Sequence, residues 1–278
     1  MTPPVVVKFG GELLENSSRL QAVVTSIAQI AEAAGPLVIV HGGGKEIDAA
    51  LQLAGIDKQQ VDGLRITDER TLDVVVSVLA GSVNTRVVAA LAAAGVSAVG
   101  LTGADGKIGL ADVAPAHTSL DGTSVDLGRV GLPSTESDTR LLQTLIDEGF
   151  VPVVSSIGMT TDGQLLNVNA DTMAGHLAAA LHARRLVIAG STPGVLDADG
   201  RTVALLDPAA IAALVSSGTA TAGMIAKLRA CEEALAGGVD DVVIVDGRDA
   251  DVLRTSCLAA RPVPPQATLI VTIVGTQS

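Results

Sequence analysis

The sequence predicts an α/β fold with a mainly parallel open sheet and helices on both of its faces. Short apolar runs rich in β-branched residues recur along the chain, and Gly, Ser or Asp follows each run closely. Segments with apolar residues at helical spacing lie between these runs. Continuous apolar runs are typical of strands buried on both faces, and strands that alternate with helices favour a parallel sheet.

Six of these runs are predicted to be buried strands. They cover residues 5–9, 37–40, 98–101, 151–155, 186–189 and 242–245. After the first strand, a helix is expected to begin near Ser17, because apolar residues repeat at helical spacing from Leu20 to Ala34. A later helix is expected around Cys231 for the same reason.

Two interruptions of the strand and helix pattern are predicted to be hairpins. One is the polar region 105–129, and the other is the segment 159–168, where Asp162 and Gly163 suit a tight turn. A boundary is expected near Ala183, where a helix ends and the strand pattern restarts. It divides the chain into two lobes, residues 1–183 and 184–278.

The composition excludes several classes of protein. With 278 residues, 48% of them hydrophobic, the chain can bury a sizeable core. The net charge of -12 argues against a nucleic-acid partner, which needs clustered Lys and Arg. No uninterrupted apolar run approaches the roughly 18 residues of a membrane span, and the chain opens without a signal-peptide pattern. We therefore expect a cytoplasmic protein with no membrane partner, whose Cys231 and Cys257 are free thiols.

Glycine-rich loops follow several predicted strands, at the edge where open parallel sheets bind their ligands. Gly10 and Gly11 follow the first strand, and "HGGGKEID" places Gly43 and Gly44 after the second. The segments "SSIG" and "GSTPGV" follow two later strands. Such loops bring backbone N–H groups close to an anion, but they are also consistent with tight strand-to-helix turns. None of them has the spacing of a P-loop or a dinucleotide-binding motif.

Two lysines occupy unusual positions. Lys8 lies at the end of a buried strand, where an ammonium group needs a partner or a path to water. Lys227 lies near the start of a predicted helix, where the macrodipole disfavours a cation unless an anion is close. Lys45 and Arg65 are consistent with ordinary surface charges.

The segment "NVNAD" lies between the second hairpin and a predicted helix. Asp171 is most simply a helix N-cap there, and Asn167 and Asn169 are consistent with turn formation or with orienting a ligand. The four histidines have no metal-ligand spacing, so no protein-held metal site is expected. No motif for covalent catalysis is present in the sequence.

The chain resembles the acetylglutamate kinases of the amino acid kinase family through motifs that occur in order over nearly its whole length. These are "KFGGELL", "VIVHGGGKEID", "DGLRIT", "LAGSVNTRVV", "GRVGLP", "PVVSSIG", "GQLLNVNAD", "PGVLDADG" and "GMIAKL". Each motif alone is weak, whereas the ordered set is specific. The resemblance implies an open three-layer αβα sandwich and transfer of a phosphoryl group from ATP to the side-chain carboxylate of N-acetyl-L-glutamate, in arginine biosynthesis.

The resemblance also implies a role for each lobe and for the residues that match the motifs. Residues 1–183 would bind the amino acid and form a homodimer, and residues 184–278 would bind ATP, which carries Mg²⁺. The residues at the transferring phosphoryl group would be Lys8, Lys227, Gly11 and Asp171, with Asp171 holding both lysines. Those at the amino acid would be Gly43, Gly44, Arg65 and Asn167. Those bordering the nucleotide would be Ser191, Thr192, Pro193, Gly194, Val195, Leu196, Thr219, Ala220 and Thr221.

This chemistry explains a lysine at the end of the first strand. The acceptor is a carboxylate with a reference pKa near ~4.3, so it is ionised at neutral pH and needs no general base. The reaction needs cancellation of the repulsion between this carboxylate and the phosphate, together with in-line alignment. Two lysines from separate lobes, N–H donors and Mg²⁺ would supply that cancellation.

The chain departs from the family pattern in two places. Ser191 stands where the family usually has an acidic residue, which leaves open the contacts to ATP and also a role as a binding protein with little turnover. Arginine-inhibited relatives carry an extra N-terminal helix, whereas the first strand is expected within five residues of Met1, which favours an arginine-insensitive homodimer.

Kinases for aspartate, glutamate, carbamate, uridylate or carrier-bound aminoadipate are the rival assignments within the same fold.

Overall fold

The computed structural model describes residues 2–119, 121–259 and 263–272. Its centre is an eight-stranded sheet in the order β14-β16-β15-β13-β1-β2-β10-β5. The strands are β1 (Val5–Phe9), β2 (Leu37–His41), β5 (Ala98–Thr102), β10 (Val151–Ser155), β13 (Arg185–Gly190), β14 (Leu205–Leu206), β15 (Val242–Asp246) and β16 (Ala267–Ile270). All neighbours pair in parallel except β15 and β16. The predicted six strands and their mainly parallel arrangement are confirmed.

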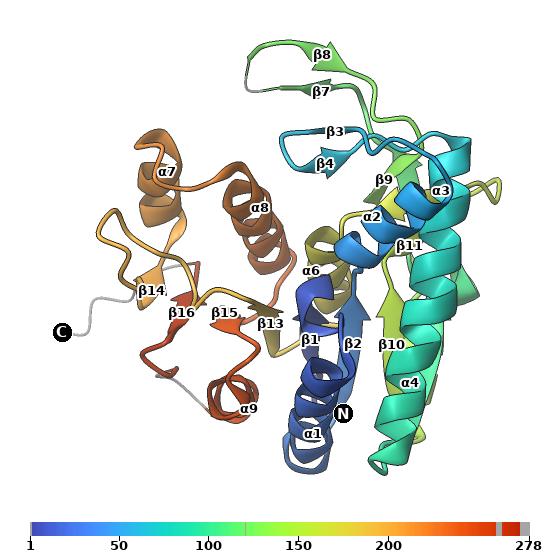
Figure 1. Cartoon of the computed structure of the whole chain (residues 1–278). Helices are drawn as coiled ribbons and strands as arrows, with labels where there is room; N and C mark the ends of the chain where they lie inside the picture. Colours follow the sequence, from blue (N-terminus) through green and yellow to red (C-terminus); the bar gives the residue numbers. More distant parts are fainter. Residues whose placement is uncertain (1, 120, 260–262, 273–278) are drawn as a thin grey trace.

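Helices cover both faces of this sheet, as a three-layer α/β sandwich requires (Figure 1). One face packs against α1 (Ser17–Ala34), α2 (Gly44–Leu53), α3 (Glu69–Val76), η2 (Ser77–Val83), α4 (Asn84–Ala93) and α9 (Ala250–Leu258). The other packs against α5 (Arg140–Asp147), α6 (Ala170–Ala180), α7 (Pro208–Ser216) and α8 (Ala222–Ala236). The predicted helix starting near Ser17 is confirmed, and its cap is Asn16, whose side chain accepts a hydrogen bond from the Arg19 N–H.

Alternation along β1 decides which face each of its side chains enters. Val5, Val7 and Phe9 belong to the core on the α1 side. Val6 belongs to the core on the side of α6 and α8. Because side chains of a strand alternate between faces, Lys8 points to the same side as Val6.

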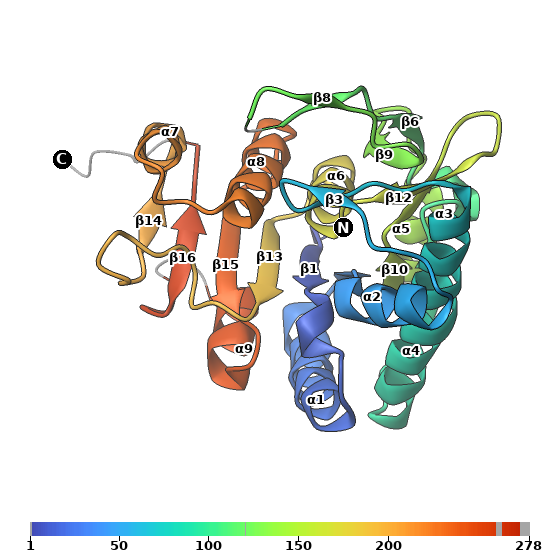
Figure 2. The same cartoon turned by 45° about the horizontal axis from the view of Figure 1, so that its top comes forward.

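Small β elements lie together in the upper part of Figure 2, and the central sheet lies below them. A second sheet has the order β11 (Ile157–Met159), β12 (Leu165–Val168), β9 (Val130–Pro133) and β6 (Ala111–Val113). Two further hairpins are β3 (Gln60–Val61) with β4 (Leu64–Arg65), and β7 (His117–Thr118) with β8 (Ser124–Val125). Short 3-10 turns, η1 (Gly11–Leu13) and η3 (Asp105–Lys107), complete the described elements.

Of the two predicted hairpins, one is confirmed and the other is only part of a larger arrangement. The segment 159–168 does form one, because Met159 pairs with Leu165 and Gly163 adopts φ +89° in the turn between β11 and β12. The region 105–129 contains the β7–β8 hairpin, but it also contributes β6 to the second sheet. The interpretation of this whole region as one hairpin was therefore incomplete.

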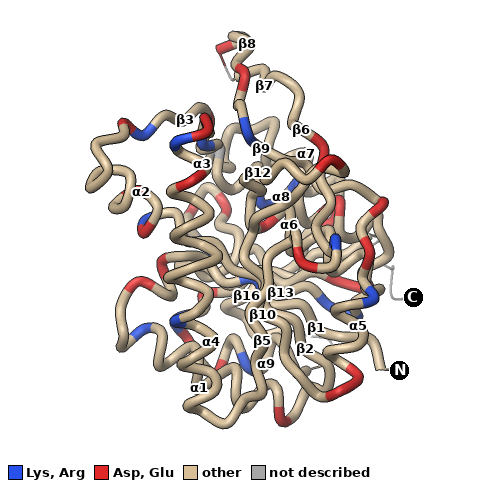
Figure 3. Tube along the Cα trace, turned by 90° about the vertical axis from the view of Figure 1, so that its right-hand side faces the viewer, with Lys and Arg blue, Asp and Glu red and all other residues tan. Residues whose placement is uncertain are grey.

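The helical segment Glu69–Ala93 is long and apolar enough to cross a membrane by length and composition alone. Core helices of soluble proteins meet the same criterion, and this segment contributes Val75, Leu79, Val83 and Leu91 to the hydrophobic core. In the view of Figure 3, acidic segments lie along the whole outline of the molecule, and the strands at its centre carry few charged residues.

A buried ion pair connects β13 to the segment before β15 and to the end of α9. Arg185 is 4% exposed and donates through Nε and Nη2 to the two carboxylate oxygens of Asp241, at 2.5 and 2.9 Å. Its Nη1 donates to the carbonyls of Ser256 and Ala259 at the end of α9. The pair therefore links β13, the segment before β15 and α9.

We expect Asp241→Asn to reduce the free energy of unfolding by about 3–5 kcal/mol, because it leaves a buried guanidinium without its counter-charge. Urea denaturation measures the change. The matched control is Asp251→Asn, whose side chain is 88% exposed and pairs with Arg254, so a loss below about 1 kcal/mol is expected. Equal losses in the two variants would contradict the structural role of the buried pair.

Candidate active site

Two lysines from opposite parts of the chain meet on one carboxylate. Lys8 of β1 lies 2.8 Å from Asp171 Oδ1, measured from its Nζ. Lys227 of α8 lies 2.9 Å from Asp171 Oδ2. Asp171 is in the first turn of α6, which packs against α8 and over β1, so the alternation that aims Lys8 at this face brings all three groups together.

The N-cap interpretation of Asp171 was wrong. Asn169 is the cap of α6, and its side chain accepts hydrogen bonds from the backbone N–H groups of Asp171 and Thr172. The Asp171 carboxylate therefore does not cap the helix, and it contacts Lys8 and Lys227. Its place in the first helical turn also favours a negative charge, because the helix dipole is positive there.

The three charges are almost fully removed from water. The side chains of Lys8, Asp171 and Lys227 are 10%, 13% and 16% exposed. Burial lowers the pKa of Lys8 from its ordinary value, although Asp171 opposes this by favouring the ammonium form. Burial alone would raise the pKa of Asp171, but the two ammonium groups outweigh it and hold that pKa well below its usual range. The carboxylate is thus ionised at neutral pH.

Two glycine loops lie close together beside Lys8. A Cβ at Gly11 would lie 2.9 Å from the Gly43 Cα and 3.0 Å from the Gly44 nitrogen, so the loops approach as closely as glycine allows. Gly43 is the N-cap of α2, and no side chain caps this helix. The first N–H groups of α2 therefore remain available to an anion.

These groups surround a cavity of about 430 Å³. The predicted residues that line it are Lys8, Gly11, Gly43, Gly44, Arg65, Asn167 and Asp171. Lys227 reaches the cavity through its contact with Asp171. The structure thus brings together all eight residues assigned to the phosphoryl group and to the amino acid.

Arg65 is a half-buried cavity residue and not an ordinary surface charge. It extends from the β3–β4 hairpin, and its Nη2 pairs with the Asp48 carboxylate on α2. Its buried Nη1 has no hydrogen-bond partner among the described residues, so one donor of the guanidinium remains for a ligand. Asp48 also binds Lys58 at 2.9 Å, and both cations lower its pKa against the opposing effect of burial. The sequence interpretation had missed Asp48, whose role depends on contact with a distant hairpin.

Two of the remaining predicted residues also have defined surroundings. Asn167 lies on β12 and donates from Nδ2 to the Thr67 hydroxyl, 3.1 Å away, next to the β4 strand that carries Arg65. Lys45 is 69% exposed and pairs with Glu15, as expected of a surface charge, but it also lines the rim of the cavity next to Gly44.

The segments predicted to border a nucleotide lie outside this cavity. Ser191 to Leu196 follow β13, where Arg248 donates to the Ser191 carbonyl and Thr268 accepts a hydrogen bond from the Val195 N–H. Thr219 to Thr221 precede α8, and Thr221 is its N-cap. The first segment therefore follows the carboxyl end of β13, and the second precedes the amino end of α8, the helix that carries Lys227.

His41 and Asn84 were also missed, although both belong to motifs noted in the sequence. His41 ends β2 directly before the glycine loop and is fully buried. Asn84 donates from Nδ2 to His41 Nε2 at 3.0 Å, so His41 carries its proton on Nδ1 and donates to the Gly42 carbonyl at 3.1 Å. The same peptide unit bears the Gly43 N–H, which points the opposite way. By holding the Gly42 carbonyl, His41 and Asn84 thus fix the orientation of the Gly43 N–H group, and Gly43 lines the cavity.

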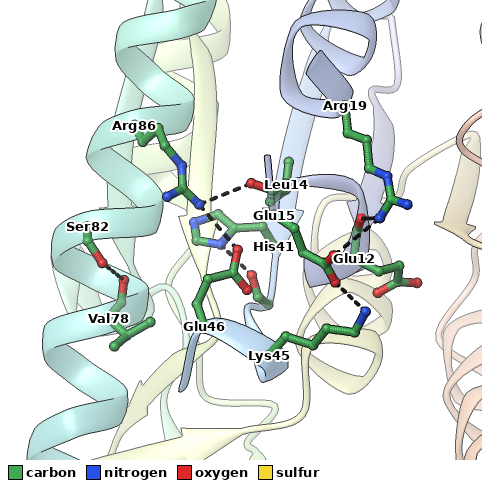
Figure 4. Close-up of polar contacts among 11 residues, drawn as sticks. Glu12, Leu14, Glu15, Arg19, His41, Lys45, Glu46, Val78, Ser82 and Arg86 are labelled. Carbon is green, nitrogen blue, oxygen red and sulfur yellow. Dashed lines mark hydrogen bonds and ion pairs between the residues drawn. The ribbon is translucent and has the colours of Figure 1, made fainter. Parts of the chain in front are cut away.

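A polar network connects the start of α2 to Arg86 and Arg19 (Figure 4). Arg86 of α4 donates to the Leu14 carbonyl and to Glu46 of α2, at 3.1 and 3.2 Å. Glu15 binds both Arg19 and Lys45. These contacts tie the turn after β1 to the start of α2.

Protonation of His41 is expected to weaken the fold in acid. Burial lowers its pKa to about 4 from an ordinary value of 6.5. Between about pH 6.5 and about pH 4 the unfolded chain binds a proton at His41 and the folded chain does not, so the free energy of unfolding falls as pH falls. Gln does not titrate, so His41→Gln should show a shallower fall in urea denaturation across this window. Parallel curves for the two proteins would contradict a neutral His41.

Sequence comparisons agree with the geometry. The profile of the Amino acid kinase family matches residues 3–246. The chain is 40% identical over 247 residues to an acetylglutamate kinase of Oleidesulfovibrio alaskensis, covering 88% of this chain and 83% of that relative. This chain belongs to the amino acid kinase family. A second relative in the family, the acetylglutamate kinase of Novosphingobium aromaticivorans, is 40% identical over 265 residues, covering 92% of this chain and 87% of that one.

Solved structures of the amino acid kinase fold superpose on nearly the whole chain. An N-acetylglutamate synthase from Neisseria gonorrhoeae, complexed with coenzyme A and N-acetyl-glutamate, gives a TM-score of 0.80 at 26% identity. The match covers 98% of this chain but only 60% of the synthase chain. A carbamate kinase from Giardia lamblia bound to AMP-PNP gives a TM-score of 0.69 at 17% identity, covering 98% of this chain and 99% of that one, which supports the fold alone.

Proposed function

We propose that this protein is an acetylglutamate kinase, which transfers the γ-phosphoryl group of ATP to the side-chain carboxylate of N-acetyl-L-glutamate in arginine biosynthesis. The observation that carries the proposal is the convergence of Lys8 and Lys227 on Asp171, beside two glycine loops. Relatives at about two-fifths identity that are acetylglutamate kinases supply the choice of substrate.

The proposed reaction needs positioning and charge compensation and no catalytic base. A carboxylate oxygen of the acceptor forms a bond to the γ-phosphorus, and the bond from phosphorus to the bridging oxygen breaks, with its electron pair leaving on ADP. No proton moves, because the acceptor is ionised at neutral pH. Lys8 and Lys227 offset the negative charge on the transferring group, and Asp171 keeps both ammonium groups at that place.

The acceptor would lie between the glycine loops and the β3–β4 hairpin. The free Nη1 of Arg65 suits its α-carboxylate, and Asn167 suits a polar contact to the same molecule. The N–H groups at Gly43 and Gly44 suit the carboxylate that is phosphorylated. Residues 1–183 thus form the proposed amino-acid lobe.

Residues 184–278 form the proposed ATP lobe, with Ser191 to Leu196 and Thr219 to Thr221 at the nucleotide. Mg²⁺ would arrive with ATP and neutralise oxygens of its phosphates. The described residues contain no group of three or more His, Cys, Asp or Glu side chains suited to a metal. A nucleotide-borne ion fits such a site, because Mg²⁺ in kinases keeps water and phosphate ligands and needs few carboxylates.

Measuring ADP release with N-acetyl-L-glutamate, L-glutamate and L-aspartate in parallel tests the proposal, with hydroxylamine added to trap the acyl phosphate. ADP and hydroxamate should form together with N-acetyl-L-glutamate and at background rates with the other two. Preference for an unacylated amino acid would contradict the substrate assignment, and the absence of turnover with all three would contradict the kinase assignment.

We further propose that the protein is a homodimer. β5 is the outer strand of the central sheet, and the neighbouring helix Glu69–Ala93 leaves Val74, Val76 and Val88 only half-buried. An open edge beside apolar side chains is a surface that proteins usually cover. Light scattering after size-exclusion chromatography should give twice the chain mass of 27.8 kDa, and a mass of one chain would contradict the proposal.

A further inference from the structure

Glu12 is a cavity residue that the proposed reaction does not use. It lies in the turn η1, directly after Gly10 and Gly11, and it lines the cavity beside Lys8. Its backbone carbonyl accepts a hydrogen bond from Arg19. Its carboxylate forms no hydrogen bond and no ion pair with any residue that the structure describes, and no dashed line reaches it in Figure 4.

The Glu12 carboxylate lies between the ends of two adjacent strands. A Cβ at Gly10, after β1, would collide with both of its oxygens. A Cβ at Gly190, at the end of β13, would lie 3.5 Å from Oε1. Two positions without side chains therefore leave room for this carboxylate at the junction of the proposed lobes, in the wall of the cavity that Lys8 and Asp171 also line.

The other carboxylates on the cavity wall are already neutralised. Asp171 binds Lys8 and Lys227, and Asp48 binds Arg65 and Lys58. Among the described residues that line the cavity, Glu12 is thus the carboxylate without a bound cation.

This arrangement conflicts with binding a bare nucleotide. Asp171 forms ion pairs with Lys8 and Lys227, whereas Glu12 interacts with Lys8 and Arg248 only through longer-range electrostatics, without an ion pair. The Glu12 carboxylate and a triphosphate placed next to it carry charge of the same sign and repel each other. A divalent cation between the two anions reverses the sign of this interaction.

We propose that Glu12 contacts the divalent cation that accompanies the nucleotide, directly or through one of its waters. The inference rests on the proposed function, since it assumes that a nucleoside phosphate occupies this junction. Mg²⁺ in phosphoryl-transfer sites is held by one or two carboxylates together with phosphate oxygens. Ser191 to Leu196, the loop across the junction, offers no acidic side chain, so Glu12 supplies the protein's carboxylate.

Calorimetric titration with ADP, in excess Mg²⁺ and in excess EDTA, tests this inference without turnover. Wild-type protein should bind ADP more tightly with Mg²⁺. In Glu12→Gln the ratio of the two dissociation constants should fall by at least about tenfold, because metal-free ADP binds more tightly once the repelling charge is gone and Mg-ADP binds more weakly. Glu12→Ala should behave in the same way, which separates loss of charge from a specific effect of the amide.

The control is Glu148→Gln, which removes an exposed carboxylate at the end of α5, and its ratio should equal that of the wild type. Thermal melts should show all three variants folded. Wild-type ratios in both Glu12 variants would overturn the inference and leave the proposed function intact. Failure of the wild type to bind ADP in either condition would overturn the proposed function, and the inference with it.

Discussion

Lys8→Ala is expected to lower kcat at least a hundredfold while the protein stays folded. The loss corresponds to about 3 kcal/mol of barrier, a reasonable share for one of two cations that face the transferring group in a site shielded from water. The fold should survive, because Asp171 keeps its 2.9 Å contact with Lys227 and the variant leaves no unpaired charge. Steady-state kinetics with N-acetyl-L-glutamate and a thermal melt measure the two parts of this prediction.

The matched control is Arg140→Ala, which removes an exposed guanidinium group that pairs with Asp138 and lies outside the cavity. Its kcat should stay within about threefold of the wild type, because a screened surface cation contributes little. Near-normal turnover in Lys8→Ala would remove Lys8 from the mechanism. An equal loss in Arg140→Ala would show that general positive charge, and not the position of Lys8, matters.

Asp171→Asn is expected to be at least as severe, and it should also change the pH dependence. The amide keeps the shape of the side chain but leaves two nearly buried ammonium groups without an anion between them. We expect kcat to fall at least a hundredfold and the free energy of unfolding to fall by about 3–5 kcal/mol.

The pH dependence follows from the charges around Lys8. Burial and Lys227 lower the pKa of Lys8, whereas Asp171 raises it, so removing the carboxylate lowers that pKa further. The residual activity of Asp171→Asn should therefore decline at a lower pH than wild-type activity when pH is raised. Asp48→Asn, which removes a cavity carboxylate bound to Arg65, should leave this alkaline decline in place. An unshifted decline in Asp171→Asn would contradict the coupling of Asp171 to Lys8.

The sequence was sufficient to predict the strands of the central sheet that are marked by continuous apolar runs. The strand β14 was not predicted, because two residues are too short to carry such a signal. The strand β16 was overlooked, although its four residues are as apolar as those of several strands that were predicted. Lys8 and Lys227 could be singled out from the sequence, because the end of a buried strand and the start of a helix are both unfavourable positions for an ammonium group without a partner. Asp171 was misinterpreted, because the same local rule applies to Asn169 two residues earlier, and only the structure shows which side chain caps the helix.

The supporting residues could not be found from sequence patterns alone. Asp48 and Arg65 are 17 residues apart, and His41 and Asn84 are 43 apart, so each pair depends on how separate elements pack. Glu12 follows two glycines in a turn, and nothing local distinguishes it from a solvent-exposed acid. Its significance comes from the absence of a side chain at Gly10 and Gly190, which is a property of the assembled sheet.

A crystal structure with ADP, aluminium fluoride and N-acetyl-L-glutamate tests the central claim most directly. The Nζ atoms of Lys8 and Lys227 should both lie within about 3 Å of the planar fluoride group or its neighbouring oxygens, while Asp171 still contacts both lysines. A complex in which either ammonium group points away from the transferring group would contradict the account.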